Sequence, residues 1–188
     1  MMEAVLKIKK EKGFYTYEDY SKLPEGAPYQ LIGGKLVMTP APIPYHQEVS
    51  KKLEFKIYEY AELKNKLGKM YHSPIDVYFE ETEVYQPDII FISRERLDIV
   101  KENKIEGAPD LVIEILSPTT AYYDLKHKKF IYSKHGVREY WVVDIIDKTV
   151  DIYENRGNEL ILIESVKGEG KIKSKVILGF EIELSEIF

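Results

Sequence analysis

Two segments of this 188-residue chain are almost uninterrupted runs of apolar residues, Tyr85–Ile92 and Asp110–Leu116. A strand with one wet face alternates polar and apolar residues, whereas a strand that is buried on both faces does not. These two runs, and a third at Glu139–Ile145, therefore predict strands in the middle of a sheet. Such a sheet must be covered on both sides, which points to a layered α/β fold.

The remaining segments supply the elements that such a sheet needs around it. The strongest helical pattern is Tyr45–Leu67, where Val49, Leu53 and Ile57 recur at helical spacing before Gly68. The other expected elements are the helices Tyr17–Lys22 and Thr120–Lys134, the hairpins Tyr29–Ile32 with Lys35–Met38 and Thr149–Glu154 with Leu160–Ser165, the strand Pro74–Phe79, and short strands in Lys171–Phe188. We expect one domain over residues 1–188, with residues 1–14 disordered. Its class is α/β (α+β), with a mixed central sheet flanked by helices and added N- and C-terminal β-hairpins.

Composition excludes several classes of site. The chain has no cysteine, which rules out disulfides, zinc–thiolate sites and cysteine nucleophiles. It also lacks the glycine-rich phosphate loop, the dinucleotide fingerprint and the serine-hydrolase elbow. No stretch looks like a signal peptide or approaches membrane-spanning length, so we expect a cytoplasmic protein without membrane contact. The net charge of −5 is unlike that of a protein that coats DNA, although a local basic patch can still bind nucleic acid.

One carboxylate interrupts each of the first two apolar runs, Asp88 in the first and Glu114 in the second. A buried carboxylate is costly unless a partner compensates its charge. Two such residues on strands that we expect to be neighbours suggest a shared divalent cation, because Mg²⁺ prefers hard oxygen ligands. The backbone carbonyl of Ile115 is a third candidate ligand. The alternative is that each acid lies at a strand end, solvated or paired with a basic residue, and the pattern alone leaves both readings open.

The expected helix Thr120–Lys134 carries the next group of candidates. Asp124, Lys128 and Tyr132 are four residues apart and therefore share one helical face. A lysine that faces the metal pair would stabilise the charge that develops on a phosphate. Lys126, Lys128 and Lys129 also form a local basic patch suited to a DNA backbone. The alternative is an Asp124–Lys128 ion pair on a solvated helix face.

Three further residues are candidates for supporting roles. His46 begins the long helix and is a candidate to hold a metal ligand in place, to act as a general base or to donate to a phosphate, or else it is a packing or capping residue. Glu48 follows within the same turn and is a weaker candidate acid near the metal. Asp76, in the expected strand Pro74–Phe79, is a further acid that would support the site.

Taken together, the motifs of this chain resemble the Uma family of restriction endonuclease-like bacterial proteins. The resemblance covers roughly Tyr15 to Phe188 and depends on the order of segments that are each weak alone. These segments are Tyr29–Met38, Pro42–His46, Ser73–Val77, Gln86–Ile90, Gly107–Pro118, Asp124 with Lys128 and Tyr132, Gly136–Asp144 and Ser174–Phe180.

The resemblance implies a PD-(D/E)XK nuclease core, in which metal carboxylates lie on adjacent strands and a lysine completes the site. Asp88 matches the first acid and Glu114 the second. The chain departs from the superfamily pattern two residues after Glu114, where Leu116 replaces the expected lysine. Lys128, on the following helix, is the best match for the displaced lysine. The chain also departs at Gln30 and Lys35, where relatives often carry acids, which puts full activity in doubt.

The leading hypothesis is therefore hydrolysis of DNA phosphodiester bonds that depends on Mg²⁺ or Mn²⁺. The second hypothesis is a catalytically weak or inactive module that keeps the nuclease fold and binds nucleic acid or a protein partner. A third and weaker one is a phosphodiesterase for RNA or a small nucleotide. Homodimerisation is expected with the first, because nucleases that cut both strands often act as twofold dimers.

Overall fold

A mixed six-stranded sheet forms the centre of the protein. The computed structural model describes residues 13–116 and 123–188, with the backbone alone for residues 123–125. The strand order is β11-β10-β9-β8-β6-β3. The strands are β3 (Gly68–His72), β6 (Ile89–Ser93), β8 (Leu111–Ile115), β9 (Glu139–Asp144), β10 (Thr149–Asn155) and β11 (Leu160–Lys167). Strands β8 and β9 are parallel and the other pairs antiparallel, which confirms the predicted mixed sheet.

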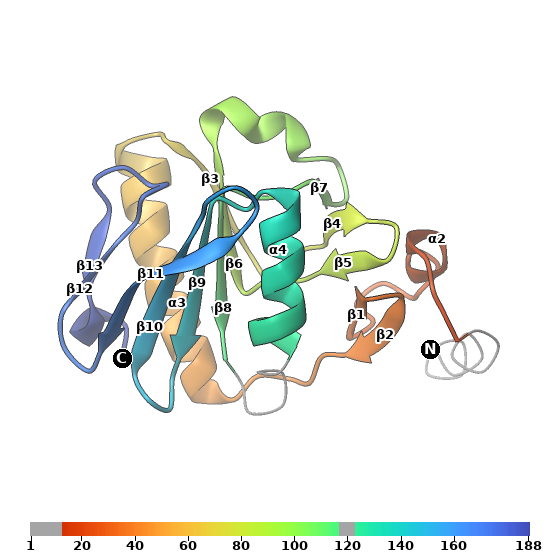
Figure 1. Ribbon diagram of the computed structural model, residues 1–188, viewed down its shortest axis with the longest axis horizontal. Helices are drawn as coiled ribbons and strands as arrows, with labels where there is room; N and C mark the ends of the chain where they lie inside the picture. The colour runs from red at the N-terminus through yellow and green to blue at the C-terminus, as the bar shows by residue number, and fades with distance from the viewer. Residues whose placement is uncertain (1–12, 117–122) are drawn as a thin grey trace.

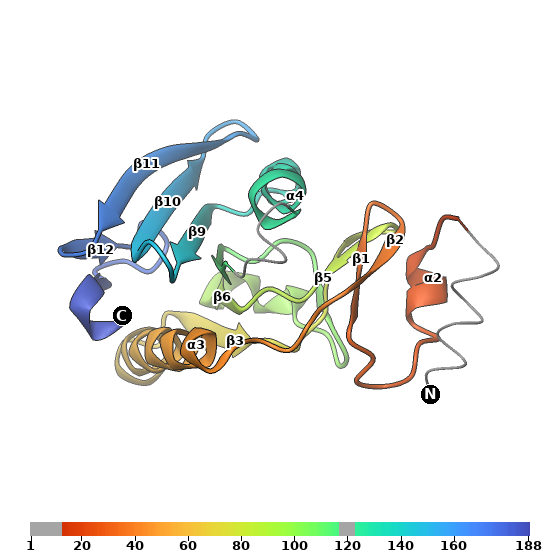
Figure 2. The same ribbon diagram turned by 90° about the horizontal axis from the view of Figure 1, so that it is seen from below.

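Helices cover both faces of this sheet, as the uninterrupted apolar runs require (Figures 1 and 2). Helix α3 (Pro44–Ile57) continues as a π-helical segment, η1 (Tyr58–Lys64), on one face. On the opposite face, a second π-helical segment, η3 (Tyr123–Lys128), leads into α4 (Lys129–His135). Alternate residues of the central strands point to one helix or the other and form two separate cores.

A smaller sheet extends from the side of the α4 layer (Figure 1). Its order is β2-β1-β5-β4-β7. It contains β1 (Tyr29–Ile32), β2 (Lys35–Met38), β4 (Val77–Glu80), β5 (Glu83–Tyr85) and β7 (Ile105–Glu106). The predicted hairpin of β1 and β2 is confirmed, and Gly33 and Gly34 both take the positive φ of its tight turn. Beside this sheet lies the short helix α2 (Tyr17–Tyr20), which Thr16 and Asp19 cap.

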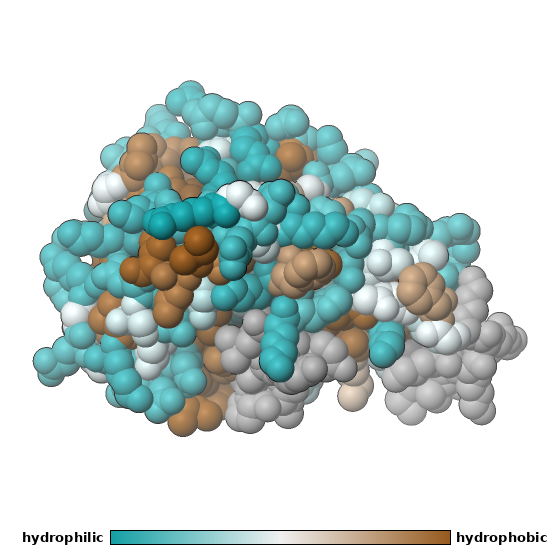
Figure 3. Space-filling view, viewed as in Figure 1, coloured by the Kyte–Doolittle hydropathy of each residue, from teal (hydrophilic) through white to brown (hydrophobic). Residues whose placement is uncertain are grey.

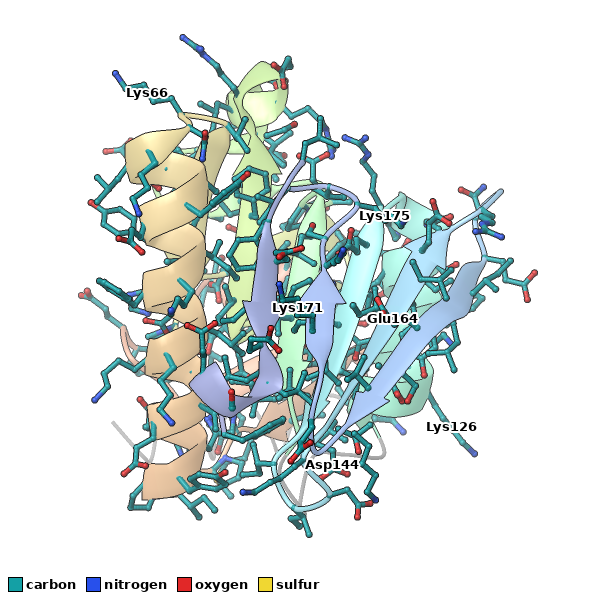
Figure 4. All side chains as sticks on the ribbon, turned by 90° about the vertical axis from the view of Figure 1, so that its left-hand side faces the viewer. Lys66, Lys126, Asp144, Glu164, Lys171 and Lys175 are labelled. Atoms are coloured by element: carbon teal, nitrogen blue, oxygen red, sulfur yellow. The ribbon has the colours of Figure 1, made fainter. Side chains whose placement is uncertain are left out.

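The chain ends on the α3 side of the central sheet. Strands β12 (Lys171–Lys173) and β13 (Glu181–Glu183) pair there, and the short 3₁₀ helix η4 (Leu184–Glu186) follows them (Figure 4). The other 3₁₀ segment is η2 (Arg94–Ile99). Strand β11 is the outer strand of the central sheet and carries the exposed apolar residues Ile161 and Leu162. A view of the surface shows an apolar patch on this side of the molecule (Figure 3).

Three expectations about local structure were wrong. The run Tyr85–Ile92 is divided between two sheets, because Tyr85 ends β5 and β6 begins only at Ile89. Pro87 lies between them and has no N–H to offer a strand ladder. The strand expected from Pro74 begins at Val77.

The long helix ends at Lys64 rather than Leu67, and strand β3 was not predicted. Strand β3 has no clear alternation of polar and apolar residues and depends on pairing with β6. A Cβ atom at Gly68 would lie 2.1 Å from the carbonyl oxygen of Ile92, so this close pairing requires glycine.

The helix expected over Thr120–Lys134 is confirmed from residue 123 onward, while residues 117–122 lie outside the described ranges. The expected disorder of residues 1–14 likewise concerns residues that are almost all outside them. Among the residues that the structure describes, no helix has the length and apolar character needed to cross a membrane.

Candidate active site

The two acids singled out in the sequence meet at one end of the central sheet. Strands β6 and β8 are antiparallel, and Ile89 lies opposite Ile113. One step further along this register, Asp88 stands beside Glu114. We predicted that Asp88 lies inside a strand. It lies instead immediately before β6, which begins at Ile89. Its Oδ2 atom accepts a hydrogen bond of 2.7 Å from the backbone N–H of Ile115, which fixes Asp88 at the end of β8.

Glu114 is only 3% exposed and is held by two groups from the helix above it. The Lys128 ammonium donates to Glu114 Oε1 at 2.8 Å, and the Tyr132 hydroxyl donates to the same oxygen at 2.5 Å. These donors lie four residues apart and face the sheet together, as the helical spacing predicted. Lys128 is also 3% exposed, so the alternative of an ion pair on a solvated helix face does not hold for it.

His46 reaches the same end of the sheet from α3. Its Nε2 atom lies 3.1 Å from the carbonyl oxygen of Ile115 and 3.4 Å from Asp88 Oδ2. Burial disfavours the charged imidazole, but the hydrogen bond and charge of Asp88 outweigh this effect and raise the pKa of His46. Within the described part of the chain, His46 Nδ1 is buried without a hydrogen-bond partner. His46 is therefore buried, and it contacts the last residue of β8 through its Nε2 atom.

A pocket of about 800 Å³ opens over these residues. The residues that line it include Asp88, Glu114, Ile115, Lys128 and His46. Part of its rim is the exposed segment Thr39–Ile43, whose prolines precede α3. The pocket is thus built where both helical layers and the ends of two central strands come together.

The remaining predicted residues are placed less directly. Glu48 is exposed and lines the pocket. Asp76 does not line it and instead accepts hydrogen bonds from Tyr20 at 2.8 Å and Gln86 at 2.9 Å.

Neither of the two outer lysines lines the pocket. Lys129 lies 3.8 Å from the ring centroid of Tyr153 and does not line the pocket. Lys126 extends outward, away from α3 (Figure 4). The side chain of Asp124 lies outside the described residues.

The donors at this end of the sheet fit a hard divalent cation. Two carboxylates and the Ile115 carbonyl are all oxygen ligands, which is the set that Mg²⁺ accepts together with water. Within the described residues, Asp88 contacts the Ile115 N–H and His46 through Oδ2, which leaves Oδ1 as a candidate ligand atom. Among the described residues, no three His, Asp or Glu side chains are grouped so that they could hold a metal ion by themselves. The fit is that of a site with few protein ligands.

Some residues of the pocket were missed in the sequence. Lys51, on α3, lines the pocket, is exposed, and makes no ion pair with any residue that the structure describes. A lysine on an amphipathic helix is usually a solvated surface residue, so nothing in the sequence indicated that Lys51 lines a pocket. Gln30 lines the pocket as well, is 6% exposed, and accepts the backbone N–H of Gln86 at 3.0 Å. Lys35, the other position of departure, is exposed on β2 and is not part of the pocket wall.

Comparison with solved structures supports the fold. A structure described as "a putative nuclease belonging to DUF820 from Anabaena variabilis ATCC 29413" superposes with a TM-score of 0.75 at 21% sequence identity. The match covers 92% of this chain and 97% of that one. At this identity the likeness shows that the two proteins share their mixed α+β fold, and it does not show a shared activity. No curated protein matches the chain.

Comparison with family models adds the family itself. The model that matches is described as "Uma2: Putative restriction endonuclease" and spans residues 17–185. This range contains every residue of the pocket described above. The chain therefore belongs to the Uma2 family of restriction endonuclease-like proteins.

Proposed function

We propose that this protein is an endonuclease that hydrolyses DNA phosphodiester bonds with the help of Mg²⁺ or Mn²⁺. The observation that carries the proposal is the convergence of Asp88, Glu114 and Lys128 in one pocket of a restriction endonuclease-like family member. Asp88 and Glu114 would hold the metal with the carbonyl of Ile115. Lys128 supplies the basic group that is absent at Leu116.

Each side chain has a distinct task in this reaction. A divalent cation held by Asp88, Glu114 and the Ile115 carbonyl would polarise the scissile phosphate and lower the pKa of an attacking water. The lysine ammonium donates hydrogen bonds to the phosphate oxygens, whose negative charge grows as the water oxygen bonds to phosphorus and the ester P–O bond breaks. Tyr132 keeps the Glu114 carboxylate in place from within the core. His46 does the same for the Ile115 carbonyl.

We propose a nucleic acid as the substrate because the pocket combines candidate metal ligands with an exposed lysine side chain. Lys51 extends from α3 at the pocket and is suited to a phosphate next to the scissile one. Lys126 and Lys129 lie on other sides of their helix, so contacts from them would require DNA that extends beyond the pocket.

One observation favours the second candidate, a nuclease-fold module that binds nucleic acid or protein without cutting. Glu114 already receives a lysine and a tyrosine in this structure, so its charge is compensated without metal. In such a module the Glu114–Lys128 pair would be purely structural.

Cleavage of supercoiled plasmid DNA by the purified protein tests the proposal. We expect nicking or linearisation that requires Mg²⁺ or Mn²⁺ and stops with a chelator. Asp88→Ala and Glu114→Gln should each abolish it while circular dichroism shows a folded protein. Cleavage that survives the combined Asp88→Ala and Glu114→Gln substitutions contradicts the assignment. Metal-independent DNA binding without any cleavage by the wild-type protein supports the second candidate.

Three further predictions go with this proposal. The protein is expected to be cytoplasmic, to fold as one domain over residues 1–188, and to form a homodimer if it cuts both strands. Sedimentation with and without DNA measures the last of these directly.

A further inference from the structure

A further buried carboxylate lies on the small sheet and does not line the pocket. Glu83, on β5, is 3% exposed and accepts hydrogen bonds from three sides. Its Oε2 atom receives the backbone N–H of Gly33 at 2.9 Å and the Tyr85 hydroxyl at 2.5 Å. Its Oε1 atom lies 3.0 Å from Nε2 of His127. Glu83 does not line the pocket, and the proposed reaction gives it no task.

The partner of Glu83 is the residue that directly precedes the proposed catalytic lysine. His127 and Lys128 are the last two residues of η3, and α4 starts at Lys129. A π-helical segment is rare and is frequently found at a functional site. Here it ends at the residue that must reach Glu114.

Groups that are bound to Glu83 contact both Lys128 and the residue before it, His127. The Lys128 ammonium lies 5.7 Å from the ring centroid of Tyr85, whose hydroxyl is bound to Glu83. A Cβ atom at Gly33 would lie 3.6 Å from the His127 ring, so the turn of the β1–β2 hairpin packs directly against the histidine. The small sheet therefore contacts η3 through one carboxylate, one imidazole and one aromatic ring.

We infer that Glu83 is a positioning residue, which acts through His127 to hold the end of η3 where Lys128 meets Glu114. A lysine has a long flexible side chain, which loses conformational entropy when its ammonium group is held in one position. This loss is smaller when the backbone of the lysine and a neighbouring side chain are already fixed. The inference rests on the proposed function for its catalytic consequence. The placement of Lys128 itself does not depend on that function.

The same sheet and helix offer a matched control. Glu80, on β4, contacts Lys134 at 2.6 Å and His135 at 3.0 Å, near the other end of α4. This is again a glutamate of the small sheet bound to a histidine of the helical layer. It differs in being partly exposed and about two helical turns away from Lys128. Loss of the Glu80–His135 contact should loosen the same two layers without moving the lysine.

The experiment measures how fast an amine-reactive reagent modifies Lys128 in the folded protein, by peptide mass spectrometry. Lys126, which is exposed, serves as the internal reference. We expect His127→Leu to raise the relative modification rate of Lys128 by about 10-fold, because the ammonium leaves its buried place more often. His127→Gln, which keeps a donor for Glu83, should restore protection. The control His135→Leu should leave the rate unchanged.

Cleavage kinetics provide the second readout. If the wild-type protein cleaves DNA, His127→Leu should lower kcat by about 10-fold to 100-fold and change KM little, because a misplaced catalytic group weakens the transition state more than binding. Glu83→Gln gives a second way to weaken the contact should His127→Leu not fold, because glutamine has one acceptor oxygen for the three groups that contact Glu83.

The two proposals fail in different ways. Absence of cleavage by the wild-type protein contradicts the proposed function, while the modification rates still decide the role of Glu83. Equal protection of Lys128 in wild type, His127→Leu and Glu83→Gln overturns the positioning role, whether or not DNA is cut. An equal loss of protection in His135→Leu overturns it as well, because it would show a general loosening of the helix.

Discussion

Strand β8 has a buried acid at each end, and the two acids differ in nearly every other respect. Asp110, just before the strand, is fully buried and does not line the pocket. It accepts the backbone N–H of Ser93 at 2.7 Å and pairs with Arg96 at 2.8 Å and Arg138 at 3.2 Å. Glu114, four residues later, accepts hydrogen bonds from the Lys128 ammonium and the Tyr132 hydroxyl. It lines the pocket together with a second acid, Asp88.

The comparison shows that a carboxylate in an apolar run is not by itself evidence of a site. Both acids satisfy the sequence argument equally well. Arginine in a buried pair stays charged and holds a planar geometry, so the Asp110 cluster is suited to a permanent structural role. A lysine partner with an adjacent carboxylate and an open pocket leaves room for a cation and a phosphate. We therefore expect changes at Asp110 to affect stability and changes at Glu114 to affect chemistry.

The largest effect should come from removing the structural acid. Asp110→Ala leaves Arg96 and Arg138 without their shared partner and the N–H of Ser93 without an acceptor. We expect the free energy of unfolding to fall by about 3 kcal/mol, at the low end for a broken buried pair because both arginines are partly exposed. Urea denaturation measures this.

Glu114→Gln is the matched variant at the other end of the strand. It keeps the size of the side chain and its oxygen acceptor, and we expect a smaller loss of stability than for Asp110→Ala. A loss at Glu114→Gln as large as that at Asp110→Ala would remove the distinction between the two acids.

A smaller effect is expected in the pH dependence of stability. Burial alone would raise the pKa of Asp110, but the Ser93 N–H and Arg96 outweigh it and lower the pKa below the ordinary value of 3.8. A lowered pKa means that the ionised acid stabilises the folded state. This stabilisation is complete above the ordinary value and is lost as the pH falls through the lower, folded-state pKa.

Denaturation of wild type and Asp110→Asn from about pH 6 to about pH 3 tests this prediction. The difference in stability between the two proteins should be constant at the upper end and shrink at the lower end. A difference that grows as the pH falls would show that Asp110 is not stabilised in its charged form.

The smallest effect concerns Lys51, the pocket lysine that the sequence analysis did not identify. Lys51→Ala should weaken binding of DNA without changing the fold, because Lys51 is exposed and unpaired among the described residues. The slope of log affinity against log salt concentration should fall by about 1, as for the loss of one phosphate contact. Lys52→Ala, one residue away and outside the pocket lining, is the control and should change neither quantity. An unchanged slope for Lys51→Ala would place the DNA elsewhere.

The fold could be predicted from the sequence wherever local pattern and tertiary role agree. The helix that contains Val49 and Leu53, the hairpin at Gly33 and the buried strands all carry a periodicity that matches their surroundings. Strand β3 could not be found in this way, because its place beside β6 depends on a close contact at Gly68 and not on alternation. The division of Tyr85–Ile92 between two sheets also depends on tertiary contacts, since the N–H of Gln86 binds a side chain and not a strand.

The sequence led us to expect that Asp88, Glu114 and Lys128 lie together, and all three line one pocket, but it did not predict what surrounds them. Asp88 and Glu114 stood out because charge in an apolar run is costly, and Lys128 followed from helical spacing and from family resemblance. The same reasoning gave no warning that Asp110 or Glu139 is a structural acid. Glu139 is buried and binds the backbone N–H groups of Lys175 and Val176. The contact between Glu83 and His127 spans 44 residues and has no pattern that a single sequence reveals.

Calorimetric titration of the protein with Mg²⁺ tests the central claim most directly. The account predicts binding to the wild-type protein that is lost in Asp88→Ala and in Glu114→Gln. It also predicts that Asp110→Asn, measured where that variant is folded, keeps the binding. Failure of the wild-type protein to bind Mg²⁺ or Mn²⁺, or binding that persists in both Asp88→Ala and Glu114→Gln, would contradict the claim that this end of β8 is a metal site.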